Sequence, residues 1–162
     1  MVKWRRALRW GAIALASLLG VYLAANLGLA FIYTFILTHP VCIHAPRQIA
    51  NLPDPQVIWL TSADGRSLQA WYYPGSNGAA ILASGGMGGA LGESLPPVKF
   101  LIEAGYGILQ IDSRACALPP APVTLGGKEV EDITAGLKFL LQQPEVERVG
   151  AFGFSMGGAG EI

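Results

Sequence analysis

The pattern of hydrophobic and polar positions divides the chain into two unlike parts. Residues 10–37 form one apolar run without a charged side chain. As a helix, a run of about 28 residues would be roughly 40 Å long, whereas the hydrocarbon core of a bilayer is about 30 Å thick. The pattern therefore predicts one transmembrane helix over residues 10–37, preceded by a basic segment at residues 1–9.

In the second part, short apolar runs alternate with stretches rich in glycine, proline and charge. Residues 57–61 and 67–73 have the β-branched and aromatic content of strands, and the Asp64-Gly65 pair between them predicts a hairpin. Strands that alternate with helices predict an α/β fold with a mostly parallel sheet over residues 57–162. Further strands are expected at residues 79–83, 106–111 and 148–154, and helices at residues 96–104 and 128–143.

Two kinds of connecting segment complete this organisation. Residues 38–56 contain several prolines and show no periodicity, which predicts a juxtamembrane linker. Three unusual loops, at residues 85–89, 112–120 and 153–157, each follow a predicted strand. Ligands of open α/β sheets bind beyond the carboxyl ends of the strands. We therefore expect these loops to meet on one rim of the sheet and to form the functional site.

Basic residues stand on only one side of the predicted membrane helix. Four of them precede it, and the next one in the chain is Arg47; the four are Lys3, Arg5, Arg6 and Arg9. The positive-inside rule then predicts a single-pass membrane protein with a cytoplasmic N-terminus and an extracytoplasmic second part. A cleaved signal peptide is the alternative, although the apolar run is longer than the roughly 7–15 residues typical of such a signal.

Composition narrows the class of function. The net charge is zero, and no basic stripe lies outside the first ten residues, so nucleic-acid binding has no support. The two cysteines, Cys42 and Cys116, lack metal-ligand spacing, and the sequence predicts no metal site. Because Cys42 lies beside the predicted membrane span and Cys116 in a later loop, the sequence favours two unrelated thiols over a disulfide.

The stretch from Gly153 to Gly157 has the pattern Gly-x-Ser-x-Gly. A predicted strand precedes it and a helix start rich in small residues follows, the context in which this pattern presents a nucleophilic serine on a sharp turn. Ser155 is the candidate nucleophile, and the two glycines leave room for the turn. The backbone N–H of Met156 is expected beside the hydroxyl, where it can stabilise an oxyanion. An unreactive serine in a tight glycine turn is the alternative.

A second oxyanion donor is expected from the loop at residues 85–89, of sequence Gly-Gly-Met-Gly-Gly. Backbone with so few side chains lets N–H groups point into a pocket, and the Met87 N–H is the candidate. A nucleotide-phosphate loop is the alternative interpretation. The sequence contains neither Gly-x-x-x-x-Gly-Lys-Ser/Thr nor Gly-x-Gly-x-x-Gly at this position, which counts against it.

The remaining polar candidates favour structural roles. Asp112 and Arg114 follow a predicted strand, and an ion pair or a loop brace explains them better than catalysis does. The only histidines, His39 and His44, precede the first predicted strand. Both are expected in a solvated linker, so neither is placed to act as the base for a serine nucleophile.

From residue 57 onward the sequence resembles the α/β-hydrolase superfamily, most closely its membrane-anchored and dienelactone-hydrolase-like branches. The resemblance rests on the Asp-Gly hairpin and on the motifs "WYYPG", "GGMGG", "IDSRA" and "GFSMGG". It implies Ser155 as the nucleophile and Met87 and Met156 as oxyanion-hole donors, without a cofactor. Gly85 departs from the family, which commonly has a histidine at that position.

The family's catalytic triad runs serine, acid, histidine along the chain, so the acid and the histidine are expected beyond Ile162. The sequence thus predicts the N-terminal portion of an α/β-hydrolase domain, truncated and inactive by itself. The whole protein is expected to hydrolyse an ester, thioester or amide of a small-molecule or acyl substrate through an acyl-Ser155 intermediate. A non-catalytic binding or scaffold protein, and an acyltransferase on the same fold, are the alternatives.

Overall fold

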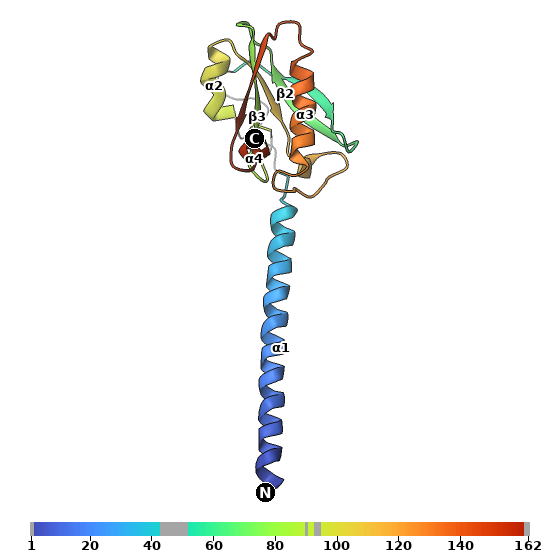
Figure 1. Cartoon of the computed structure of the whole chain (residues 1–162). Helices are drawn as coiled ribbons and strands as arrows, with labels where there is room; N and C mark the ends of the chain where they lie inside the picture. Colours follow the sequence, from blue (N-terminus) through green and yellow to red (C-terminus); the bar gives the residue numbers. More distant parts are fainter. Residues whose placement is uncertain (1, 43–51, 90, 93–94, 161–162) are drawn as a thin grey trace. The chain divides into compact units, whose positions relative to one another are not determined.

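The computed structural model describes all residues except 1, 43–51, 90, 93–94 and 161–162. It divides into two compact units, Met1–Ile36 and Leu37–Ile162. The first unit consists of most of helix α1, Val2–Thr38, a continuous helix of 37 residues (Figure 1). The helix begins ahead of the predicted span because the basic N-terminal segment is also made of good helix formers.

Helix α1 is long and apolar enough to cross a membrane, and nearly all of its described side chains are exposed. At 1.5 Å per residue its 37 residues extend over about 55 Å. A signal sequence near the N-terminus also meets these criteria of length and composition. The helix is therefore a candidate membrane span, and its topology stays a prediction.

The second unit contains an open five-stranded mixed sheet of order β1-β2-β4-β3-β5. β1 and β2 form the predicted antiparallel hairpin, and β2 also pairs antiparallel with β4. β4, β3 and β5 are parallel neighbours, so the parallel sheet with an N-terminal hairpin is confirmed. The strands are β1 Gln56–Thr61, β2 Ser67–Tyr73, β3 Ala79–Ser84, β4 Gly107–Ile111 and β5 Arg148–Gly153.

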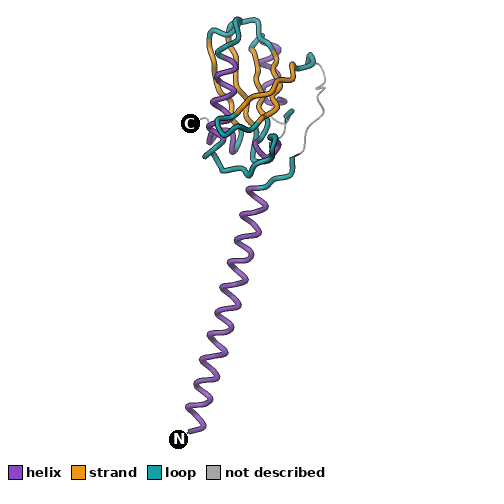
Figure 2. The backbone as a smooth tube through the Cα atoms, turned by 90° about the vertical axis from the view of Figure 1, so that its right-hand side faces the viewer, coloured by secondary structure: helices purple, strands orange, loops and turns teal. Residues whose placement is uncertain are grey.

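Helices cover both faces of this sheet (Figures 1 and 2). Side chains alternate between the faces, so that β2 turns Ala70 and Tyr72 toward one core and Trp71 and Tyr73 toward the other. The first core includes Ile133 and Leu140 of α3, and the second includes Val98 of α2. The helices of this unit are α2 Leu95–Glu103, the 3₁₀ turn η1 Arg114–Cys116, α3 Glu129–Leu140 and α4 Met156–Gly160.

The carboxyl ends of the three parallel strands meet on one rim, as predicted. β3 ends at Ser84, β4 at Ile111 and β5 at Gly153, and these residues lie level in the register of the sheet. The three unusual loops of the sequence leave the sheet at these points. Residues from all three loops line one cavity, which makes this rim the candidate functional site.

The prediction of two unrelated thiols is wrong, because Cys42 and Cys116 form a disulfide. Residues just after α1 return to the loop that follows β4, and the two Cα atoms are 5.3 Å apart. The return is also held by a hydrogen bond from the Val123 N–H to the Thr38 carbonyl oxygen, 2.8 Å. The spacing of the two cysteines in the sequence does not indicate that they lie close together, because their proximity depends on how two irregular segments fold.

Replacing Cys42 by serine is expected to destabilise the domain by about 2–4 kcal/mol, since a cross-link that closes a long loop restricts the unfolded chain. The loop here spans a sequence separation of 74 residues. Chemical denaturation of the whole protein measures the loss. Cys116→Ser should give the same shift, and the double variant should lose no more than either single one. Additive losses would contradict a shared bond as the cause.

Candidate active site

The predicted elbow joins β5 to α4, with Ser155 between them. Ser155 has a φ of 55°, in the left-handed region that a residue with a side chain rarely adopts, and its side chain is exposed. Two backbone hydrogen bonds tie the turn to the end of β3. The Phe154 N–H donates to the Ser84 carbonyl oxygen, and the Gly157 N–H to the Gly85 carbonyl oxygen, each at 3.1 Å. The turn is therefore held in a strained shape that presents the serine.

The two glycines of the elbow stand where no side chain fits. A Cβ on Gly157 would lie 2.5 Å from Ser84 Oγ and 2.7 Å from the Gly85 carbonyl oxygen. A Cβ on Gly153 would overlap the backbone of Gly157 and Gly158. Both positions thus require glycine because the chain crosses itself closely, as the motif predicts.

Gly157→Val is expected to destabilise the domain by at least about 1–3 kcal/mol, since its branched side chain would push β3 and α4 apart. Thermal unfolding of the whole protein measures the loss. The matched control is Gly150→Val in β5, where an added Cβ has its nearest neighbour at 3.8 Å. If both valine variants unfold alike, crowding at the elbow is not the reason for Gly157.

The loop after β3 lies against the elbow. A Cβ placed on Gly86 would be 3.8 Å from the Ser155 Cβ, and the Gly89 N–H donates to the Gly86 carbonyl oxygen at 2.9 Å. That bond closes the turn that carries Met87. Within the described residues, the backbone N–H groups of Met87 and Met156 donate to no acceptor. Both predicted oxyanion donors are thus available for hydrogen bonding. The structure does not show whether the two N–H groups point toward the same acceptor position.

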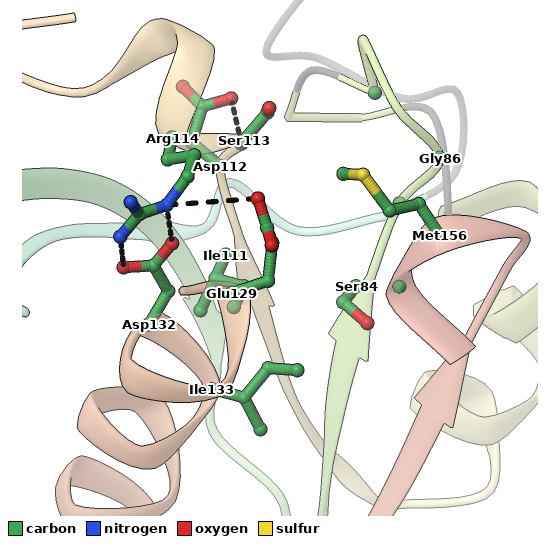
Figure 3. A pocket seen from close by; sticks show the side chains of 13 residues that line it. Ser84, Gly86, Ile111, Asp112, Ser113, Arg114, Glu129, Asp132, Ile133 and Met156 are labelled. Carbon is green, nitrogen blue, oxygen red and sulfur yellow. Dashed lines mark hydrogen bonds and ion pairs between the residues drawn. The ribbon is translucent and has the colours of Figure 1, made fainter. Parts of the chain in front are cut away.

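The cavity at this rim encloses about 30 Å³, room for one or two water molecules. Figure 3 shows Ser84, Gly86 and Met156 on one side of it and the side chains around Arg114 on the other. The exposed Ser155 lies next to the Gly86 side. The cavity is lined by Ser84, Gly85, Gly86, Gly89, Ile111, Asp112, Ser113, Arg114, Glu129, Asp132, Ile133, Met156 and Gly157.

Arg114 is 2% exposed and forms the centre of a buried ion-pair network. Its Nε donates to Asp132 Oδ2 at 2.9 Å and its Nη2 to Asp132 Oδ1 at 3.0 Å, a two-point contact (Figure 3). Nη2 also reaches Asp64 Oδ2 at 3.3 Å, and Nε lies 3.8 Å from Glu129 Oε1. The predicted structural role of Arg114 is therefore confirmed.

Sequence reasoning missed the acidic partners of Arg114, because Glu129 and Asp132 lie in the predicted helix at residues 128–143 without a motif of their own. Their spacing of three residues puts both carboxylates on one helix face, which is the signal that points to a shared cation. Asp112 bonds instead to its neighbour, since the Ser113 N–H donates to its Oδ1 at 2.9 Å. It is 3% exposed.

The electrostatics of the network favour the charged forms of Glu129 and Arg114. Burial by itself would raise the pKa of Glu129, but hydrogen bonds from the side chain and backbone of Thr124 and from backbone N–H groups lower it below its usual value. Burial by itself would lower the pKa of Arg114, but the hydrogen bonds and charge of Asp132 raise it. Opposite charges thus face one another on this side of the cavity, which suits a structural role.

The one histidine within the described residues, His39, is not among those that line the cavity. His39 is exposed, with its Nδ1 3.0 Å from the Thr38 hydroxyl oxygen. His44 lies outside the described residues. Among the described residues that line the cavity there is no histidine, so the site as described contains a candidate nucleophile and candidate oxyanion donors without the histidine base of a serine triad.

Comparison with known proteins relates this architecture to hydrolases. No protein-family model matches the chain. The uncharacterised Escherichia coli protein YfhR is 27% identical over 118 residues, which cover 66% of this chain and 41% of YfhR. The Pyrococcus furiosus esterase Pf2001 has a TM-score of 0.58 and 27% identity, over 72% of this chain and 50% of that one. GrgF of Penicillium sp. sh18, an α/β hydrolase, has a TM-score of 0.57 and 23% identity, over 66% of this chain and 39% of GrgF.

The chain spans about half the length of Pf2001 and less than half of YfhR. Within that span, the backbone superposes on these solved structures with TM-scores of 0.58 and 0.57. The sequence motifs quoted above occur at the strand ends where the resemblance expects them. The chain has an α/β-hydrolase fold and is related to the α/β-hydrolase superfamily.

Proposed function

We propose that the whole protein is a serine hydrolase that cleaves an ester, thioester or amide. Ser155 attacks the carbonyl carbon of the substrate, and the oxyanion that forms accepts hydrogen bonds from the N–H groups of Met156 and Met87. Collapse of this intermediate expels the alcohol, thiol or amine and leaves an acyl-serine. Water then attacks the acyl group, releases the acid and restores the serine. The reaction as proposed uses no metal and no organic cofactor.

One observation carries the proposal: Ser155 is held at a φ of 55° on a turn next to backbone N–H groups that have no acceptor among the described residues. A strained non-glycine residue persists only where the surrounding structure enforces it, and such residues cluster at active sites. The small helix α4 begins at Met156, so its N-terminal end also favours negative charge beside the serine.

The proposal requires a base to take the Ser155 proton. The resemblance gives the order serine, acid, histidine along the chain, so we assign the acid and the histidine to sequence beyond Ile162 in the whole protein. Residues 1–162 alone are then expected to be inactive toward nitrophenyl esters, because no base would reach the hydroxyl.

Labelling with a fluorophosphonate probe tests the proposal, since such a probe reacts only with an activated serine. The whole protein should become labelled, and its Ser155→Ala variant should not. A whole protein that folds but takes no label would favour the non-catalytic alternative, in which the elbow survives only as architecture.

We further propose that α1 anchors the protein in a membrane and that the hydrolase domain lies outside the cytoplasm. The basic residues ahead of the apolar run support this orientation. The Cys42–Cys116 disulfide supports it independently, because disulfides persist mainly in oxidising compartments.

Protease added to intact cells is therefore expected to digest residues 57–162, while the N-terminal segment stays protected. Immunoblotting with tags at either end measures this, and a cytoplasmic marker protein controls for leakage. Digestion of the domain only after lysis would reverse the orientation.

A further inference from the structure

We propose that the rim of the sheet that carries Ser155 rests on the membrane surface, and that the substrate is an acyl ester that partitions into the bilayer. The contact is made by three exposed apolar side chains, Val41, Leu118 and Leu125, here called the apolar rim patch. The inference deepens the proposed function and rests on it, and it also rests on α1 as the membrane anchor.

The segment that directly follows α1 is fastened to the loops of the candidate site. The last residue of the helix, Thr38, accepts a hydrogen bond from the Val123 N–H at 2.8 Å. A few residues later, Cys42 is bonded to Cys116 in the loop after β4. Both fastenings lie within the compact unit Leu37–Ile162. The chain therefore passes from the end of the apolar helix straight onto the rim.

The same segment also approaches the candidate oxyanion loop. A Cβ added to Gly88, next to Met87, would lie 3.2 Å from the Pro40 Cβ. Cys42 is four residues beyond Thr38, and four residues of extended chain span at most about 14 Å. A membrane that holds α1 is thus within a short reach of the loops that surround Ser155.

The apolar rim patch is exposed although its side chains are large and apolar. Val41 is 77% exposed, Leu118 57% and Leu125 59%. Each belongs to one of the fastened segments: Val41 precedes Cys42, Leu118 follows the loop's cysteine, and Leu125 follows Val123. Exposed apolar side chains on segments that are bonded to one another beside a functional site mark a candidate interaction surface.

The backbone holds Leu125 outward at a cost. Its φ is 56°, again in the left-handed region that disfavours a branched side chain. The buried carboxylate of Glu129 fixes this turn by accepting from the Thr124 N–H at 2.7 Å, the Thr124 hydroxyl at 2.6 Å and the Gly126 N–H at 2.9 Å. The structure thus enforces a strained turn that exposes Leu125 to solvent. This is consistent with a side chain that inserts into the membrane surface.

Few contacts are needed because α1 makes the association intramolecular. A tethered surface meets the bilayer at a high effective concentration, so weak individual contacts suffice to orient it. Lipid is favoured over a protein partner because Val41 lies on the segment that directly follows the apolar helix, and Leu118 and Leu125 lie on loops that are bonded to that segment. An acyl ester dissolved in the bilayer would then reach the serine without crossing water.

The first test places a fluorescent label on the patch and needs no catalysis. Both cysteines of residues 1–162 are in the disulfide, so Leu125→Cys adds one reactive thiol to this part of the chain, and the unsubstituted whole protein labelled in parallel gives the background from any other thiol. Phe100→Cys on α2, whose phenylalanine is 63% exposed, is the matched control. In phosphatidylcholine discs containing lipids with brominated chains, the label at 125 should be quenched and the label at 100 should not. A label at 125 that stays water-exposed, or is shielded without quenching, as by a protein partner, overturns the proposal.

The second test separates membrane delivery from chemistry. Replacing both Leu118 and Leu125 by serine should lower kcat/KM about tenfold on a long-chain ester embedded in vesicles, because two apolar side chains no longer enter lipid. The same variant should hydrolyse a water-soluble short-chain ester as the wild type does, and Phe100→Ser should change neither rate. Equal losses on both esters, or none on either, overturn the delivery of substrate from the bilayer. If the wild type cleaves neither ester, the proposed function fails, and the quenching result decides the membrane contact alone.

Discussion

Replacing Ser155 by alanine is expected to reduce kcat of the whole protein about a million-fold, the loss seen when the nucleophile of a catalytic triad is removed. The loss follows because water has to replace the serine as nucleophile while the remaining triad no longer has a hydroxyl to activate. Single-turnover measurements with a nitrophenyl ester would show the missing acyl-enzyme burst as well as the slower steady state.

The folding of this variant should be nearly unchanged, because the Ser155 hydroxyl makes no hydrogen bond within the described part of the chain. The matched control is Ser113→Ala on the same rim, whose hydroxyl oxygen caps the η1 turn by accepting from the Ala115 N–H at 3.3 Å. That variant should keep its activity within about tenfold and lose about 1 kcal/mol of stability. If Ser155→Ala kept most of the activity, Ser155 would not be the nucleophile.

The parts of the fold that sequence predicts well are those fixed by local chemistry. The Asp64-Gly65 turn defined the hairpin because Gly65 adopts a φ of 81° that few other residues tolerate. The apolar content and the length of each run placed the five described strands within a few residues of their observed bounds. The elbow was recognisable because its glycines answer a steric requirement that the structure displays at Gly153 and Gly157.

The parts that sequence did not predict depend on contacts between segments far apart along the chain. The Cys42–Cys116 disulfide joins two irregular segments, and no periodicity marks such a meeting. The partners of Arg114 come from the hairpin turn, through Asp64, and from the first turn of α3. The path of residues 38–42 over the rim also depends on contacts with distant segments. For this reason the sequence predicted a solvated linker, whereas the structure shows a segment that is hydrogen-bonded to the rim loops.

Replacing Arg114 by methionine is expected to cost about 3–5 kcal/mol of stability, the usual result of removing one partner from a buried ion pair. Both hydrogen bonds that Asp132 is seen to make come from Arg114, at 2.9 and 3.0 Å. Without the guanidinium, its carboxylate, which is 3% exposed, would stay charged in a site with no compensating cation or would have to take up a proton. Urea denaturation of the whole protein at neutral pH measures the loss.

A second substitution separates the lost charge pair from lost packing. The pH dependence of the wild type reports on the network through Glu129, whose pKa is lowered in the folded protein. Its contribution to stability is complete above the ordinary carboxyl pKa of about 4 and is lost as pH falls through the lowered pKa. Adding Asp132→Leu to Arg114→Met should recover most of the stability, since the buried carboxylate is then gone and Glu129 keeps its bonds from Thr124 and Gly126. A double variant as unstable as the single one would show that Arg114 stabilises the domain by packing rather than by its ion pairs. The ion-pair network would then not explain the rigidity of this side of the cavity.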